Sequence, residues 1–299
     1  MRAALGEEWQ RLIRRRRIVL LFISTVLVML LTAQGTGRLA GMATLAALPL
    51  LNAQIGRLFA TSLCLALQGW VMLLSPLLAV SAYTVGLQSK MNLTVLVARL
   101  LVVWAVIILG IILTWPFFSL LPLFGSLSLP EIGWAFAVIV VTALLSSAYG
   151  LCWVTVMRTP PAALFLAYSV LVMWLVAGVL IAVWDTQPTS LVIVAVAFNP
   201  SAALLAPLAP AFPPDGPIAA DLQNLLRFTH GVVDRATPLY RLYIAGSGLL
   251  ILGLIGIASF AVRPQPRRWQ RFDTIFSIVC VIYLAALFYW RDWWSVVLW

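Results

Sequence analysis

The sequence predicts an all-α polytopic membrane protein, and its composition and the grouping of its apolar residues carry that prediction. Of the 299 residues, 63% are apolar and only 9% are charged, whereas a soluble protein of this size has about 25% charged residues. So few charges cannot cover a surface that faces water, and disorder requires the opposite composition. The apolar residues also gather in runs that match the roughly 20 residues a helix needs to cross a bilayer.

Seven apolar runs are candidate transmembrane helices: residues 18–33, 60–83, 100–121, 134–157, 162–184, 242–262 and 274–290. Before the first run, Leu5, Trp9, Leu12 and Ile13 fall on one helical stripe, which predicts an amphipathic helix over residues 1–17 that lies on the membrane. Trp and Tyr gather at the predicted boundaries and indicate an anchoring belt in the headgroup layer. The belt comprises Trp134, Trp184, Tyr240, Tyr243, Tyr289, Trp290, Trp293, Trp294 and Trp299.

Charge predicts the orientation of these runs. The chain has 19 Lys and Arg against 9 Asp and Glu, a formal net charge of +10. If the N-terminus is cytoplasmic, most of the basic residues fall in cytoplasmic segments, as the positive-inside rule requires. This predicts an external C-terminus and a multi-pass protein of the cell membrane, in a prokaryote the inner membrane.

Residues 191–212 are long and apolar enough for a further span, but they contain Asn199-Pro200, Pro207 and Pro210. If they crossed, the basic patch at 263–271 would face outward, against the charge bias. We therefore expect residues 185–241 to form one external segment that dips partly into the interface. Residues 263–299 are then a basic cytoplasmic loop and a seventh transmembrane helix with an aromatic tail.

Enzyme signatures are few. The chain has no G-x-x-x-x-G-K-[ST], G-x-S-x-G or H-E-x-x-H, so no catalytic residue is predicted and ATP hydrolysis by this chain is excluded. A single histidine and three scattered cysteines make a metal site improbable, and none is predicted. His230 and Asp234 could pair on one helical face, but a solvated external helix with a local charge pair is the favoured explanation.

Polar residues within the spans are uncharged, which disfavours an ion- or proton-coupled carrier, because such carriers place ionisable groups in the membrane interior. They could line a translocation path or only hydrogen-bond helices together; the candidates for the path are Gln68, Ser75, Ser146, Ser147 and Tyr149. A second set, Gly246, Gly253 and Gly256, occupies one side of the sixth span and predicts a face for close helix packing, within the chain or between two copies. Pro76 and Pro116 should kink their helices.

The second span ends in Ser75-Pro76-Leu77-Leu78-Ala79-Val80-Ser81-Ala82, and the third begins near Val95-Leu96-Val97-Ala98-Arg99-Leu100-Leu101. With these motifs, residues 60–184 resemble the permease subunit of an ABC transporter of the ABC-2 type, and the second motif is similar to that family's I-V-x-G-K-L-L. The turn Met157-Arg158-Thr159-Pro160-Pro161-Ala162-Ala163 is similar to the short cytoplasmic turn before the family's fifth span. The resemblance implies a six-helix ABC-2 core, to which this chain adds a C-terminal helix.

The resemblance also implies partners and a mechanism. A separate ATPase subunit would bind ATP and Mg, a second permease copy would complete a homo- or heterodimer, and the assembly would be an exporter. The residues that would couple to the ATPase are Gly86, Gln88, Lys90, Arg99 and Arg158. The chain departs from the family at residues 83–93, which lack the usual E-R-x-x-G-T-L segment. No cofactor is expected in this chain, and no nucleic acid among its partners.

Two alternatives remain open from the sequence. One is a membrane-embedded enzyme acting on lipid-linked substrates, with residues 185–241 as its active region. The other is a noncatalytic subunit that anchors a larger membrane assembly, which would depend on the glycine face and tolerate changes at the inner polar residues.

Overall fold

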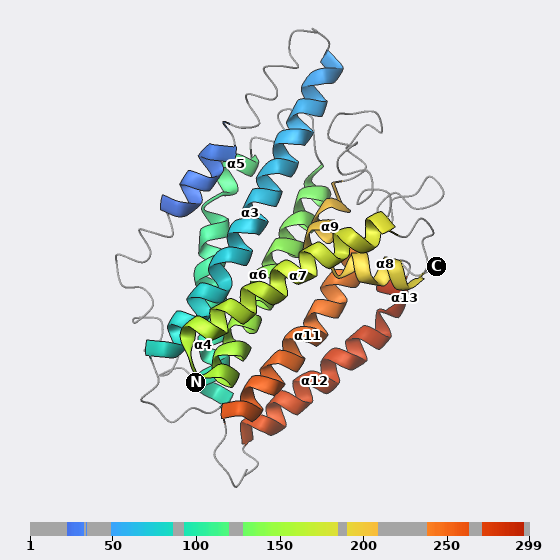
Figure 1. The fold of residues 1–299 in the computed structure, drawn as a ribbon. Coiled ribbons are helices and arrows are strands. Elements are labelled where there is room, and N and C mark those ends of the chain that lie inside the picture. The colour runs from blue at the N-terminus through green and yellow to red at the C-terminus, as the bar shows by residue number, and fades with distance from the viewer. Residues whose placement is uncertain are drawn as a thin grey trace.

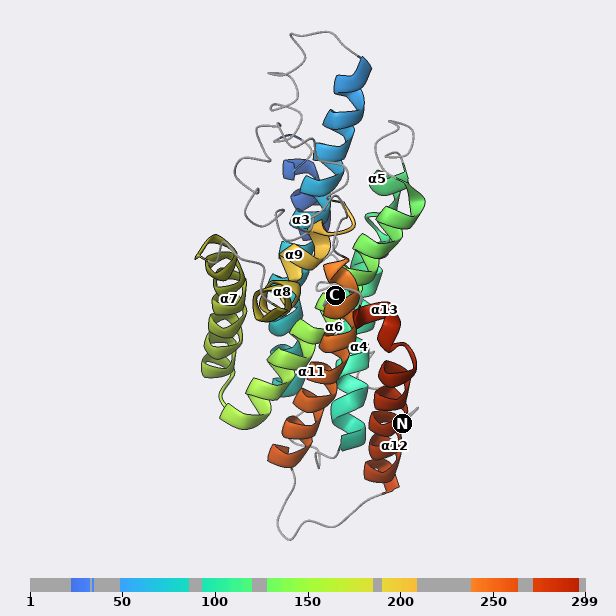
Figure 2. The same ribbon diagram turned by 90° about the vertical axis from the view of Figure 1, so that its right-hand side faces the viewer.

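The computed structural model describes residues 23–32, 34, 49–85, 93–119, 128–184, 190–208, 238–262 and 271–295. Within these ranges every regular element is a helix (Figure 1). The long helices run side by side as a bundle, and a 90° turn of the view shows α7 set apart on one flank and α12 on the other (Figure 2). The chain is therefore all-α, as its composition predicts.

Five of the described helices are long and apolar enough to cross a membrane. They lie in α3 (Pro49–Val85), α4 (Leu93–Ile112), α6 (Leu129–Met157), α7 (Pro160–Trp184) and α11 (Leu239–Val262). Two apolar helices are shorter: Ile23–Thr32, and Asp273–Tyr289 within α12 (Arg271–Tyr289). These helices make the protein a multi-pass membrane protein.

Helix ends differ from the expected ranges where local chemistry moves them. The helix expected from residue 134 begins at Leu129, because the Ser128 backbone N–H donates to the Glu131 carboxylate at 2.7 Å and Pro130 suits a first helical turn. The helix expected over 100–121 ends at Ile112. A turn follows, and Pro116 then lies in the first turn of the short helix α5 (Trp115–Ser119), where its missing N–H costs nothing.

The longest helix, α3, continues through Pro76. Its 37 residues correspond to about 55 Å at 1.5 Å per residue, well beyond the roughly 30 Å of a hydrocarbon core. Beside the proline, Tyr168 of α7 donates its hydroxyl to the Leu73 carbonyl at 2.6 Å. On the other side α6 approaches so closely that a Cβ at Gly150 would lie 2.7 Å from the Pro76 Cα. A glycine is thus required where these two helices cross.

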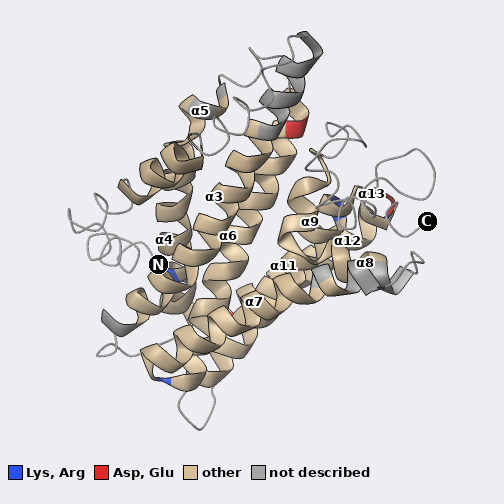
Figure 3. Ribbon diagram, turned by 45° about the horizontal axis from the view of Figure 1, so that its top comes forward, with Lys and Arg blue, Asp and Glu red and all other residues tan. Residues whose placement is uncertain are grey.

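The helix α6 lies at the centre of the bundle, where it packs against α3, α4, α7 and α11. Its buried residues are mostly small or β-branched, among them Ala135, Val138, Ile139 and Ala143. Large exposed side chains on α7 and α12, such as Phe165, Val172, Ile278 and Phe288, are apolar, as surfaces that face lipid require. Charged residues are few along the described helices (Figure 3).

In the described part of the segment between α7 and α11 are two short helices, α8 (Ser190–Ala197) and α9 (Pro200–Leu205), separated by a turn at Asn199. The sequence predicted that this segment dips partly into the interface. In the structure α9 instead lies inside the bundle, against α3, α6 and α11, and Ala202, Ala203, Leu204 and Leu205 are at most 1% exposed. The apolar stretch buries its side chains in protein, while Asn199-Pro200 ends the first helix.

Candidate functional site

Six buried polar residues surround the break between α8 and α9, and we call them the buried polar layer. They come from α3, α6, the α8–α9 turn and α11, and each is at most 1% exposed. The buried polar layer comprises Gln68, Thr142, Ser146, Asn199, Tyr243 and Ser247. All six are uncharged.

Asn199 organises the break itself. Its Oδ1 accepts from the backbone N–H groups of Ser201 at 2.9 Å and Ala202 at 3.4 Å, which caps the first turn of α9. Its Nδ2 donates to the Leu175 carbonyl of α7 at 2.9 Å. Pro200 follows in the first helical position, where proline is favoured. One side chain therefore starts α9 and ties it to α7.

Gln68 links the same break to α3. Its Nε2 donates to the Pro200 carbonyl at 2.8 Å, across 132 positions of sequence. Its Oε1 is buried and has no hydrogen-bond partner among the described residues. A buried acceptor without a partner costs about 1–3 kcal/mol, so this oxygen is a ready acceptor for a water or for a donor group of a ligand.

Tyr243 joins α11 to α6. The Thr142 hydroxyl donates to the Val138 carbonyl of its own helix at 2.7 Å, so the hydroxyl of Tyr243, 2.9 Å away, donates to Thr142. One turn further along α11, the buried Ser247 hydroxyl lies near that of Tyr243 but makes no hydrogen bond of good geometry. Gln68 Oε1 on α3 and Ser247 Oγ on α11 are thus the two oxygens of the layer that lack a well-formed hydrogen bond among the described residues.

A small cavity of about 10 Å³ opens within this layer, which is about the space that one water needs. The helices α3, α6, α7 and α11 and the start of α9 all contribute to its wall. It is lined by Met72, Thr142, Leu145, Ser146, Leu171, Trp174, Pro200 and Tyr243. The lining is apolar apart from three hydroxyls, so the cavity suits a neutral molecule or group rather than an ion.

Of the predicted path residues, Gln68 and Ser146 belong to the buried polar layer. Two others satisfy their hydroxyls within their own helices: Ser75 donates to the Val71 carbonyl at 2.6 Å and Ser147 to the Ala143 carbonyl at 2.7 Å. Tyr149 is half-buried and packs edge-on against Trp174, with ring centroids 5.8 Å apart. The structure does not gather all five around one space.

Sequence reasoning missed Asn199, Tyr243 and Ser247 as members of the site. The pair Asn199-Pro200 predicts a break in the apolar run, and an Asn-Pro pair within such a run is also an N-cap signal. The sequence places Tyr243 in the interfacial belt, but in the structure it is fully buried. Tyr243 lies about one turn after the start of α11. This position within the helix distinguishes it from a tyrosine at the membrane boundary.

The predicted coupling residues are only partly described. Gly86, Gln88 and Lys90 lie outside the described residues, as do His230 and Asp234. Arg99 is fully buried; its Nη1 donates to the Tyr83 carbonyl at 3.4 Å and its guanidinium lies 5.9 Å from the centre of the Tyr83 ring. It therefore supports the last turn of α3, where a cation is favourable, rather than offering a surface to a partner.

Arg158 is exposed at the end of α6. Its φ of 57° makes it the only non-glycine residue of the described ranges with a positive φ. This left-handed conformation ends the helix and reverses the chain into α7. The guanidinium is therefore presented on a tight turn between two candidate spans.

Of the three glycines predicted to form a packing face on α11, only Gly246 is closely approached by another described part of the chain. A Cβ at Gly246 would collide with the ring of Phe198, so α8 needs this glycine to approach. At Gly253 and Gly256 a Cβ would meet no described atom within 4 Å. Gly248, which the sequence did not single out, is the contact point of Tyr283, whose hydroxyl donates to the Ala245 carbonyl at 2.7 Å.

No family model, curated protein or solved structure matches this chain. The ABC-2 resemblance therefore remains a prediction from the sequence. Among the described residues no three His, Cys, Asp or Glu side chains gather as a metal site would require, and Cys64, Cys152 and Cys280 are free thiols. The chemistry that the buried polar layer can perform is the hydrogen bonding of neutral groups.

Proposed function

We propose that this chain is the transmembrane permease subunit of an ABC-2 type exporter, driven by a separate ATPase subunit. The observation that carries the proposal is the helix break at Asn199, which together with α9 lies inside a bundle of candidate spans and is surrounded by the buried polar layer. Interrupted helices occur at membrane depth only where they are buried in protein or line a water-filled cavity. In transporters such interruptions mark the substrate path.

The polar layer suits a passage for a neutral or amphipathic substrate. Gln68 Oε1 and Ser247 Oγ lack a well-formed hydrogen bond among the described residues, so each can accept a donor from a molecule that reaches the layer. In this conformation the cavity has room for about one water. Translocation would therefore require α7 and α9 to move together away from α3 and α6. This movement would break the bond from Gln68 to the Pro200 carbonyl, while the Asn199 bonds within α9 and to α7 would persist.

The ATPase subunit would dock at the end of the bundle where α6 turns into α7. Arg158 is exposed on that turn, and the short connection between α3 and α4, residues 86–92, is the second contact that the resemblance implies. A basic end of this kind would face the cytoplasm, where an ATPase with ATP and Mg could bind it. The open space beside Gly253 and Gly256 would receive a second permease copy.

Co-purification tests this proposal. We expect the tagged full chain, isolated from its native membrane, to carry a subunit with a phosphate-binding loop, identified by mass spectrometry, and the complex to hydrolyse ATP. Arg158→Ala should lower that hydrolysis severalfold, because it removes the charge presented on the coupling turn. Arg291→Ala is the matched control, since Arg291 is an exposed arginine at the start of another helix, α13 (Arg291–Ser295).

Three results would contradict the proposal: the absence of any nucleotide-binding subunit, ATP hydrolysis unaffected by Arg158→Ala, or transport that persists without the ATPase. An enzyme acting on lipid-linked substrates would instead lose turnover in His230→Ala and Asp234→Ala, whereas a permease should tolerate both changes.

A further inference from the structure

A cluster of aromatic rings holds one arginine near the start of α11. Trp134 of α6 stacks at a tilt on Tyr240 of α11 and on Trp293 of α13 (Arg291–Ser295), with ring centroids 5.0 and 5.8 Å apart. The Arg241 guanidinium lies 5.8 Å from the centre of the Tyr240 ring and 5.5 Å from that of Trp293. We call these four residues the Arg241 cluster. Three elements that are remote in sequence meet in it.

Two hydrogen bonds hold the Arg241 guanidinium in place and leave its other N–H donors unpaired among the described residues. Its Nε donates to the Tyr240 hydroxyl at 3.4 Å and its Nη1 to the Trp293 carbonyl at 3.3 Å. Both bonds are long, and they engage two of the five N–H groups of an arginine. The remaining donors, including those on Nη2, have no partner among the described residues.

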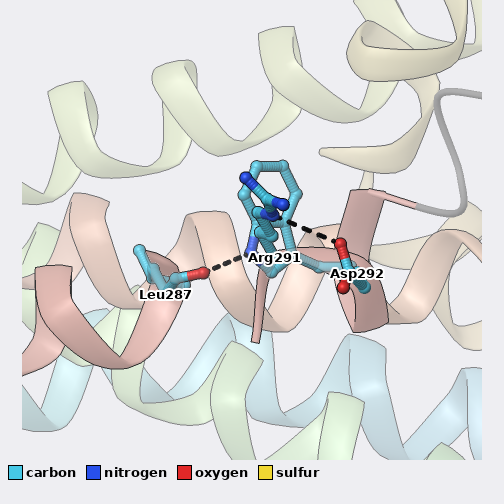
Figure 4. Close-up of polar contacts among 4 residues, drawn as sticks. Leu287, Arg291 and Asp292 are labelled. Atoms are coloured by element: carbon cyan, nitrogen blue, oxygen red, sulfur yellow. Dashed lines mark hydrogen bonds and ion pairs between the residues drawn. The ribbon is translucent and has the colours of Figure 1, made fainter. Parts of the chain in front are cut away.

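The positive charge of Arg241 also has no counter-charge in the part of the chain that the structure describes. The ion pair found there joins Arg291 and Asp292 at 3.3 Å, both exposed (Figure 4). Arg241 is half-buried among aromatic rings, where a cation without an anion is costly. Cation–π contacts offset only part of this cost, so an anion bound beside the guanidinium would still be favourable.

The position of the cluster indicates which anion it meets. Arg241 lies in the first turn of the candidate span α11, and Trp134 in the second turn of α6. Tryptophan and tyrosine favour the headgroup layer of a bilayer, which is where phospholipid phosphates lie. A guanidinium binds a phosphate through paired N–H donors, and the aromatic rings pack against the adjoining glycerol and acyl carbons.

We infer that the Arg241 cluster binds the phosphate group of a phospholipid, and that this lipid completes the docking of α13 on α11. The inference concerns a different part of the chain from the buried polar layer and does not depend on the proposed transport function. A free phosphate ion could bind the same donors, and the experiment below distinguishes it from a phospholipid.

Native mass spectrometry of the delipidated full chain measures the binding, with three probes: phosphatidylglycerol, diacylglycerol with the same acyl chains, and inorganic phosphate. We expect the wild type to bind phosphatidylglycerol about tenfold more tightly than diacylglycerol, the equivalent of one charge-assisted hydrogen bond. In Arg241→Gln this ratio should fall close to one. Arg291→Gln, which changes an exposed and paired arginine, should keep the wild-type ratio.

Arg241→Lys keeps the positive charge but not the paired N–H donors. Its binding ratio of phosphatidylglycerol to diacylglycerol should therefore lie between those of the wild type and Arg241→Gln. If Arg241→Gln does not fold, the comparison of Arg241→Lys with the wild type tests the inference. Equal binding of both lipids by the wild type, or a wild-type ratio in Arg241→Lys and Arg241→Gln, would overturn the inference. Inorganic phosphate that binds as tightly as phosphatidylglycerol would assign the cluster to a free anion instead.

Discussion

Asn199 offers the sharpest test of the break between α8 and α9, because one side chain makes two separable kinds of contact. Its Oδ1 caps α9 through Ser201 and Ala202, and its Nδ2 bonds the Leu175 carbonyl of α7. Loss of an N-cap costs about 1 kcal/mol, within a range of about 0.5–2. An interhelical hydrogen bond in a membrane protein contributes about 0.6 kcal/mol on average.

We therefore expect Asn199→Ala to lower the free energy of unfolding by about 1.5–2.5 kcal/mol. Asn199→Ser should lower it by only about 0.6 kcal/mol, because a serine hydroxyl still caps α9 but does not reach α7. Unfolding of the purified protein by SDS in mixed micelles, followed by circular dichroism, measures both values. Ser169→Ala, an exposed position on α7, is the control and should change the stability by less than about 0.5 kcal/mol.

Two outcomes would refute this reasoning. If the alanine variant stays within about 0.5 kcal/mol of the wild type, the break does not depend on Asn199 at all. If the serine variant loses as much as the alanine variant, the contact with α7 rather than the cap stabilises the break, and the assignment of Asn199 as an N-cap is wrong.

The same assay tests the close helix contacts at glycine. Gly150→Val should destabilise the protein by about 1–3 kcal/mol, since a Cβ there would lie 2.7 Å from the Pro76 backbone, which cannot move aside as a side chain can. Gly246→Val should cost a comparable amount, because the ring of Phe198 occupies the space of the new side chain. Gly253→Val is the matched control on the same helix as Gly246; with no described atom within 4 Å, it should change the stability of the monomer by less than about 0.5 kcal/mol. Equal losses at Gly246 and Gly253 would show that valine in α11, rather than contact with Phe198, causes the effect.

Much of the helical framework could be read from the sequence, and so could part of the site. Gln68 and Ser146 stand out in the sequence as polar residues within apolar runs. In the structure Gln68 bonds the Pro200 carbonyl at the break between α8 and α9, and Ser146 lines the adjoining cavity. Thr142 and Tyr243 could not be paired in the same way, because 101 positions separate them. A helix that is apolar on every side carries no pattern to show which side faces the protein, so the rotation of each helix, and with it these contacts, stayed hidden.

Arg99 and Tyr243 illustrate the same limit at single residues. From the sequence, a charge near a helix start suggests a partner-facing contact, and a tyrosine near a boundary suggests the headgroup layer. In the structure both side chains are fully buried, because the neighbouring helices α3 and α6 lie over them and supply the Tyr83 carbonyl and the Thr142 hydroxyl.

The sequence by itself determined that this protein is a set of apolar helices. A chain with 9% charged residues has to satisfy its backbone hydrogen bonds internally, and helices do so within each segment. Only the tertiary structure decided that α9 enters the bundle, that six polar side chains gather around the break before it, and that Arg241 lies among three aromatic rings. Those placements depend on side chains from different helices that fill one space together, which no local pattern in a single helix specifies.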